Sequence, residues 1–118
     1  MFMFEKLEVY RKALDLVNQT ISLSESLPKG YYSLKDQLIR AALSVPTNIA
    51  EGNGRWHKRD KHNFFVIARG SCFECVPILQ ILKANGLIDP PNHDHSILAL
   101  EEISKMISGL IKNCGVED

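Results

Sequence analysis

The sequence lacks any uninterrupted apolar run of the roughly 18 residues needed to cross a bilayer. It also lacks an N-terminal order of positive charge followed by an apolar stretch, because Met-Phe-Met-Phe leads directly into Glu5 and Lys6. We therefore expect neither a membrane-spanning segment nor a secretory signal. We predict a cytoplasmic protein that has no membrane partner.

Cysteine is scarce, with three residues in a chain of 118. An odd number of thiols in a chain long enough to bury a core favours a reducing compartment over a disulfide framework. Cys72 and Cys75 spell C-x-x-C, but they lie inside a helical pattern with no preceding strand, unlike a redox pair. The alternative is a zinc site with Cys114 and a histidine, which would need four ligands at supported spacings. We predict that the cysteine side chains are buried in the core and that the protein binds no metal and no cofactor.

Net charge is absent as well, since 14 Lys and Arg residues balance 14 Asp and Glu residues. The charges are nevertheless unevenly placed along the chain. Residues 55–88 contain six basic and two acidic residues, a net charge of +4, whereas residues 89–118 contain two and six, a net charge of −4. Overall neutrality therefore does not exclude an anionic partner.

Patterns typical of catalysis are missing too. There is no nucleophile with an evident base, no Gly-rich phosphate loop after a strand, and no pair of carboxylates on one buried face. The Glu-x-x-His pairs of carboxylate-bridged metal bundles are also absent. Gly70 and Ser71 follow Arg69 within a helical pattern, where glycine most simply permits a close approach of helices. We predict that the protein is not an enzyme.

The sequence does contain four segments whose apolar residues recur at helical spacing. We predict that the first helix covers about 5–26, that the second runs from a capping box of Ser33 and Asp36 to Gly54, and that the third covers about 58–85. The fourth follows the loop DPPNHD, with Asn92 or Asp94 as its cap. No segment alternates with period two. One domain, 1–118, with an all-α fold is expected, an antiparallel up-down-up-down four-helix bundle. The predicted buried rows are Leu7, Tyr10, Leu14, Val17 and Ile21; Leu34, Leu38, Ala41, Val45 and Ile49; Phe64, Ala68, Ser71, Cys75, Ile78 and Leu82; and Ile103, Ile107, Leu110 and Cys114.

The second predicted helix is apolar on more than its core side. A second row, roughly 120° from the first at 3.6 residues per turn, contains Ile39, Leu43, Pro46 and Ala50. This row fits either a wide core stripe or a subunit interface. We predict an oligomer interface, since closed homo-oligomers are common.

The stretch RWHKRDKH gathers positive charge at the start of the third predicted helix. Arg55, Lys58, Arg59 and Lys61 surround one acidic residue and Trp56. Cations at this end of a helix oppose the macrodipole, so a bound phosphate would favour them, and Trp56 could stack on an unpaired base. The alternative is a solvated charge run with Trp56 packed between helices. We predict a nucleic-acid contact formed by these five residues.

Three stretches carry a family resemblance: FEKLEVYRKALDL, LPKGYYSLKDQLIRAALSVPTNIAEGNGR and FFVIARGSCFE. They resemble the four-helix-bundle proteins encoded in intervening sequences of bacterial 23S rRNA genes, a family that includes the accessory variability proteins of diversity-generating retroelements. The family pattern falls on Arg40, Pro46, Asn48, Ile49, Ala50, Glu51, Gly52, Arg55, Gly70, Ser71 and Glu74.

The resemblance implies an antiparallel bundle that assembles with copies of itself, as a homopentamer with a central channel. It further implies a non-enzymatic protein associated with rRNA intervening sequences, with RNA or DNA as partner; the retroelement members also bind a reverse transcriptase. Pro77 and the near-neutral charge depart from the family pattern. The alternative function is a structural or protein-interaction module without nucleic-acid binding. In it the polar stripe of the second predicted helix, Arg40, Ser44, Asn48, Glu51 and Arg55, and the apolar second row would bind other copies or an unrelated protein.

Overall fold

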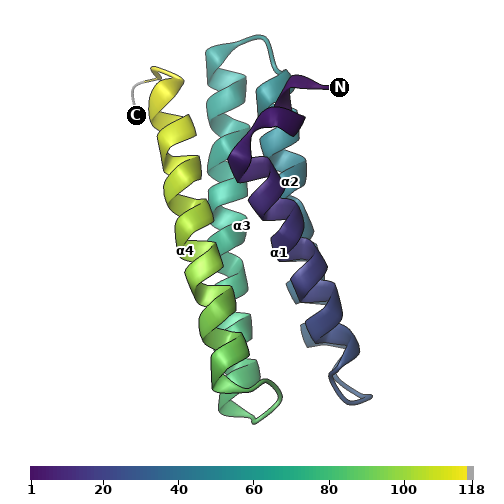
Figure 1. The fold of residues 1–118 in the computed structure, drawn as a ribbon. Coiled ribbons are helices and arrows are strands. Elements are labelled where there is room, and N and C mark those ends of the chain that lie inside the picture. Colours follow the sequence, from purple (N-terminus) through teal and green to yellow (C-terminus); the bar gives the residue numbers. More distant parts are fainter. Residues whose placement is uncertain (117–118) are drawn as a thin grey trace.

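The computed structural model describes residues 1–116, and within that range the chain is helical without strands. A short 3-10 helix, η1 (Met3–Lys6), precedes α1 (Glu8–Glu25), α2 (Tyr32–Gly54), α3 (Lys58–Ala84) and α4 (Pro90–Asn113) (Figure 1). Each long helix packs against two others, in the cyclic order α1, α2, α3, α4. The predicted up-down-up-down four-helix bundle is confirmed.

The start of α4 differs from the prediction, because DPPNHD forms its first turn instead of a loop. Asp89 is the N-cap residue, and its Oδ1 accepts a hydrogen bond of 2.8 Å from the backbone amide of Asn92. Pro90 and Pro91 occupy the first two helical positions, where a missing backbone N–H costs no intrahelical hydrogen bond. The proposed caps Asn92 and Asp94 were therefore wrong.

The predicted capping box at the start of α2 was also wrong. The helix begins at Tyr32 without a side-chain cap, so Ser33 already lies inside it. The Ser33 hydroxyl accepts a hydrogen bond from Gln37 Nε2, and Asp36 forms an ion pair of 2.9 Å with Arg40. Both side chains therefore pair with residues one turn further along the helix.

The core of α1 is formed by a different row from the predicted one. The buried residues are Val9, Ala13, Leu16, Thr20 and Ser24. In the predicted row Leu7, Tyr10 and Val17 are half-buried against the core, and Leu14 and Ile21 are exposed. Thr20 can be buried because its Oγ1 donates a hydrogen bond of 2.7 Å to the Leu16 carbonyl. A hydroxyl that bonds to its own helix costs little to bury, although it breaks the apolar pattern in the sequence.

The other predicted rows lie in the core, apart from the half-buried Leu34, Phe64 and Leu110. Cys72, Cys75 and Cys114 are free thiols and are buried. Burial raises the pKa of the Cys72 and Cys75 thiols to about 12. They are protonated at neutral pH, which agrees with the predicted packing role.

Proline interrupts neither α2 nor α3. Pro46 is buried within α2, and Pro77 lies on the exposed side of α3. Among the described helices, α3 alone has the length and composition that would allow it to cross a membrane, and 44% of that stretch is buried. In this fold its inner side belongs to the bundle core, so the other apolar side chains form an outer surface.

Candidate nucleic-acid interface

The corner between α2 and α3 is built around a glycine. Gly52 is buried in the last turn of α2 and packs beneath the ring of Phe65 on α3. A Cβ atom at Gly52 would lie 2.6 Å from Cε1 of Phe65, closer than such atoms can approach. The absence of a side chain thus lets α3 start directly beside the end of α2, and residues 55–57 span the turn (Figure 1).

Lys61 closes this corner from the α3 side. Its Nζ donates hydrogen bonds to the carbonyl oxygens of Asn53, at 2.8 Å, and Gly52, at 3.4 Å. These carbonyls belong to the last turn of α2, where backbone acceptors lack helical partners and a cation is favoured. Of the five predicted binding residues, Lys61 is therefore already hydrogen-bonded within the fold.

Arg55 is held in place by two neighbours. Its Nη2 donates to Glu51 Oε2 at 3.2 Å, and its guanidinium lies 4.6 Å from the centre of the Phe64 ring. Glu51 and Arg55 thus form an ion pair between residues one turn apart. Because both groups are partly exposed, the pair fixes the direction of the guanidinium more than it stabilises the fold.

Lys58, Arg59 and Trp56 project into solvent. Trp56 is 92% exposed, so the alternative that it packs between helices was wrong. Lys58 and Arg59 are exposed and, within residues 1–116, form no ion pair with an acidic side chain. They lie in the first turn of α3, whose N-cap residue His57 offers no side-chain acceptor to the backbone amides.

A hollow adjoins the corner on the side of the N-terminal segment. Its volume is about 640 Å³, and it is lined by Phe2, Phe4, Thr47, Ala50, Glu51, Gly54 and Arg55. The rings of Phe2 and Phe4 stack with centroids 5.5 Å apart and an interplanar angle of 15°. Sequence reasoning missed these two residues because η1 is too short to show a helical period; the repeated Met-Phe was the available signal.

The predicted oligomer row of α2 is only partly available to a partner. Pro46 is buried within the chain, so its assignment to an outer interface was wrong. Ala50 is half-buried and lines the hollow beside η1, and Ile39 is half-buried as well. Leu43, at 49% exposure, is the residue of this row that faces solvent. The chain's own N-terminal segment thus covers part of what appeared to be a free apolar row.

Two of the polar motif residues, Asn48 and Ser71, lie at the junction of α2 and α3. The Ser71 hydroxyl donates to Ser44 Oγ at 2.8 Å, and Asn48 Nδ2 donates to the same oxygen at 2.9 Å and to the Ser44 carbonyl at 2.7 Å. Glu51, Arg40 and Glu74 are exposed and stand outside this network. This hydrogen-bonded network therefore links two helices of one chain.

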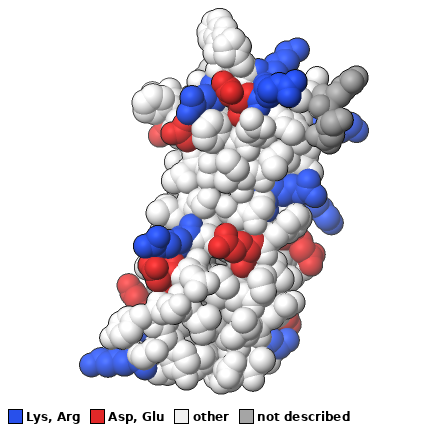
Figure 2. Space-filling view, turned by 180° about the vertical axis from the view of Figure 1, so that it is seen from behind, with Lys and Arg blue, Asp and Glu red and all other residues white. Residues whose placement is uncertain are grey.

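Figure 2 shows the side of the bundle formed by α2 and α3. Charged side chains gather at its upper end, where α2 passes into α3, and a broad uncharged band lies below them. Gly70 has no atom within 4 Å of where its Cβ would lie, so the chain's own fold does not require a glycine there. The large apolar side chains exposed on α3 are Val66, Ile67, Phe73 and Ile81.

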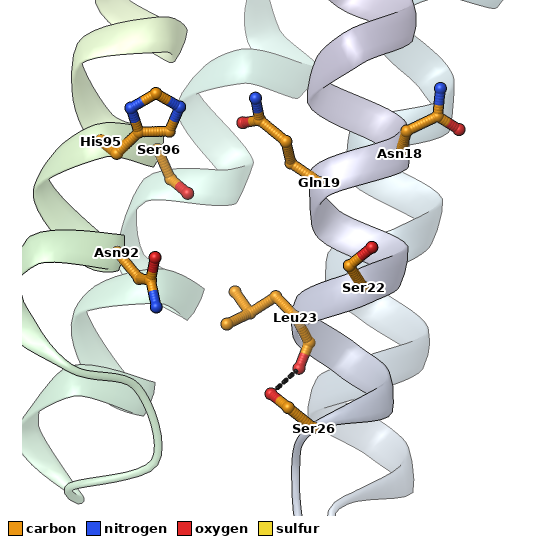
Figure 3. Close-up of a pocket in the computed structure, with 8 residues that line it drawn as sticks. All are labelled: Asn18, Gln19, Ser22, Leu23, Ser26, Asn92, His95 and Ser96. Atoms are coloured by element: carbon orange, nitrogen blue, oxygen red, sulfur yellow. Dashed lines mark hydrogen bonds between the residues drawn. The ribbon is translucent and has the colours of Figure 1, made fainter.

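A second concave surface separates the end of α1 from the start of α4. This groove measures about 550 Å³, and Figure 3 shows its lining residues Asn18, Gln19, Ser22, Leu23, Ser26, Asn92, His95 and Ser96. None of these side chains is a lysine, arginine, aspartate or glutamate, so the groove offers little to a phosphate. No hydrogen bond joins His95 to a serine among the residues drawn. The groove thus shows no activated nucleophile.

Metal chemistry has no evident site either. Residues 1–116 contain no group of three His, Cys, Asp or Glu side chains that could hold a metal ion. His93, part of the predicted loop DPPNHD, lies in α4 together with His95, and His93 Nδ1 is 3.0 Å from Asp94 Oδ1. This contact holds the pKa of Asp94 below its usual value.

These features define a four-helix-bundle protein with a cationic, aromatic corner and an apolar outer side. Residues 5–109 match the family model of the 23S rRNA-intervening sequence protein. The chain belongs to this family, as its motifs indicated.

The fold also matches a solved structure from the S23 ribosomal protein family, a protein of unknown function from Bacteroides thetaiotaomicron. The TM-score is 0.82 with 23% sequence identity, and the match covers 88% of this chain and 98% of the other. At this identity the likeness shows the fold alone. A comparison with curated proteins finds no match.

Proposed function

We propose that this chain is a non-enzymatic, cytoplasmic protein that assembles with copies of itself and binds nucleic acid through the corner between α2 and α3. The observation that carries the proposal is the pair Lys58 and Arg59, exposed and unpaired within residues 1–116, beside the exposed Trp56. Cations at a helix start without a side-chain cap favour a bound phosphate, because side-chain charge and backbone amides attract the same anion. The family's association with 23S rRNA genes makes RNA the first ligand to test.

Assembly is supported by the outer side of α3. Phe73 is 53% exposed, and it shares this side with three other large apolar residues and with Gly70. An exposed apolar patch is usually covered by a partner, and a glycine lets a neighbouring chain approach closely. A ring of copies would bring several corners together, which multiplies the positive charge that a nucleic acid meets.

Filter binding tests the nucleic-acid proposal. Single-stranded RNA and DNA are titrated at increasing salt with the wild-type chain, with Lys58→Glu/Arg59→Glu, and with Lys105→Glu as a control on the exposed surface of α4. We expect binding that weakens with salt, and a salt slope in the double variant that is smaller by about 1.4, given about 0.7 per phosphate contact on single strands. Equal binding by the double variant, or no binding at low salt, would refute the proposal.

Light scattering tests assembly, with 13.3 kDa as the mass of one chain. The family resemblance leads us to expect five copies, and Phe73→Glu and Leu43→Glu to lower the mass. Leu98→Glu, on α4, changes another exposed leucine and should leave the mass unaltered. A wild-type protein that stays monomeric would contradict assembly. If assembly occurs without nucleic-acid binding, the chain is the structural or protein-interaction module considered as the alternative.

A further inference from the structure

We propose that the hollow between η1 and the end of α2 is a base-stacking site, so that the corner binds single-stranded in preference to double-stranded nucleic acid. The inference deepens the proposed function and rests on it. It adds Phe2, which lines the hollow together with Arg55, as a ligand-contacting residue beside Trp56 of the predicted contact.

The Phe2 ring is exposed but firmly supported. It is 71% exposed, and its inner face stacks on Phe4, whose ring meets Tyr10 edge-on at 4.9 Å between centroids. The backbone amide of Phe2 donates to Glu5 Oε2 at 2.6 Å, and the amide of Glu5 donates to the Phe2 carbonyl. Phe2 therefore offers one free aromatic face on a closed turn, as a stacking platform requires.

Arg55 connects this platform with the cationic corner. Its side chain lines the hollow, and the exposed Trp56 is the next residue of the chain. Glu51 also lines the hollow, but its carboxylate is paired with Arg55, which reduces its repulsion of a phosphate. Lys58 and Arg59 follow two and three residues after Trp56.

The chemistry of this surface matches an unpaired strand. Single strands present base faces that stack on aromatic side chains while their phosphates contact lysine and arginine. In a duplex the base faces are covered by neighbouring bases, and the grooves expose only base edges. A hollow of about 640 Å³ between two phenylalanine rings and an arginine accommodates a flat ring.

Trp56 is the single tryptophan of the chain and provides the measurement. Oligo(U), oligo(dT) and an oligo(dT)–oligo(dA) duplex are titrated while tryptophan emission and the anisotropy of a labelled strand are recorded. We expect tighter binding of the single strands and quenching of Trp56. Phe2→Ala should weaken single-strand binding about 5- to 150-fold, the range for loss of one stacked base. Phe2→Tyr, which keeps the ring, should bind like the wild type.

The possible failures are distinguishable. The stacking site is refuted, while the proposed function stands, if three results occur together. These are equal binding of single strands and duplex, unchanged Trp56 emission, and no effect of Phe2→Ala. If no nucleic acid binds at low salt, the proposed function fails and the stacking site fails with it. If Phe2→Ala lowers affinity only because it changes the mass of the assembly, Phe2 is an interface residue and the stacking site is refuted.

Discussion

Gly52 of α2 packs against the ring of Phe65 of α3, with no room between them for a methyl group. Phe65 is buried, so its ring cannot turn away without disturbing the core. This contact sets the distance between the end of one helix and the start of the next. The position of the cationic corner therefore depends on a residue that has no side chain.

Gly52→Ala should lower the free energy of unfolding by about 1–3 kcal/mol, the usual cost of inserting a methyl group into a packed core. Urea unfolding followed by circular dichroism measures the change. Gly109→Ala is the matched control, because nothing lies within 4 Å of its Cβ position on α4. Replacing that glycine should stabilise the helix by up to about 1 kcal/mol. Equal effects at the two positions would contradict the close contact.

Lys61→Met should destabilise the chain by about 1 kcal/mol, because the Gly52 and Asn53 carbonyls lose their donor. Lys58→Met removes the same charge one turn earlier without removing a described hydrogen bond. It should change stability by less than about 0.5 kcal/mol, as surface substitutions usually do. Thermal unfolding of both variants at one salt concentration separates them. A larger loss of stability for Lys58→Met than for Lys61→Met would contradict the role of Lys61 in joining α3 to the end of α2.

Asp89→Ala should cost about 1 kcal/mol, since it removes the N-cap acceptor of α4. Asp94→Asn removes a carboxylate from the same turn but retains an oxygen that can face His93, so a smaller loss is expected. Urea titration of the two variants measures the difference. A larger loss of stability for Asp94→Asn would indicate that Asp94, as the sequence first suggested, is the N-cap residue of α4.

The buried thiols should resist alkylation in the folded protein. With pKa values of about 12, Cys72 and Cys75 are almost entirely protonated at pH 8, and only the thiolate reacts. Unfolding the protein in urea removes the burial that raises the thiol pKa. It should therefore speed the alkylation of Cys72 and Cys75 far more than raising the pH from 7 to 9 does. Mass spectrometry after iodoacetamide treatment counts the modified cysteines. Rapid labelling of both at pH 8 without denaturant would contradict their burial.

Helical periodicity was enough to predict the four long helices, because most of their inner rows are apolar in sequence. It failed in α1, where Thr20 is buried whereas Leu14 and Ile21 of the predicted row are exposed. The pattern alone cannot show that a hydroxyl bonds to its own helix. At Asp89 it failed because two prolines resembled a loop, although proline fits the first turn of a helix.

The cationic corner was predictable as a cluster, but the state of each side chain was not. Lys58 and Lys61 look alike in sequence, yet the second reaches back to α2 because Gly52 brings the two helices together. Pro46 seemed to belong to an outer row, and only the position of its neighbours shows that it is buried. Such distinctions depend on tertiary contacts that no local pattern contains.

The N-terminal segment lies at the same end of the bundle as the connection between α2 and α3 (Figure 1). An affinity tag joined before Met1 would therefore sit beside the surface that the binding experiments measure. A polyhistidine tag would bring its own titratable charges to that end, and a bulky fusion partner would shield it. Protein from which the tag has been cleaved is the appropriate material for every titration.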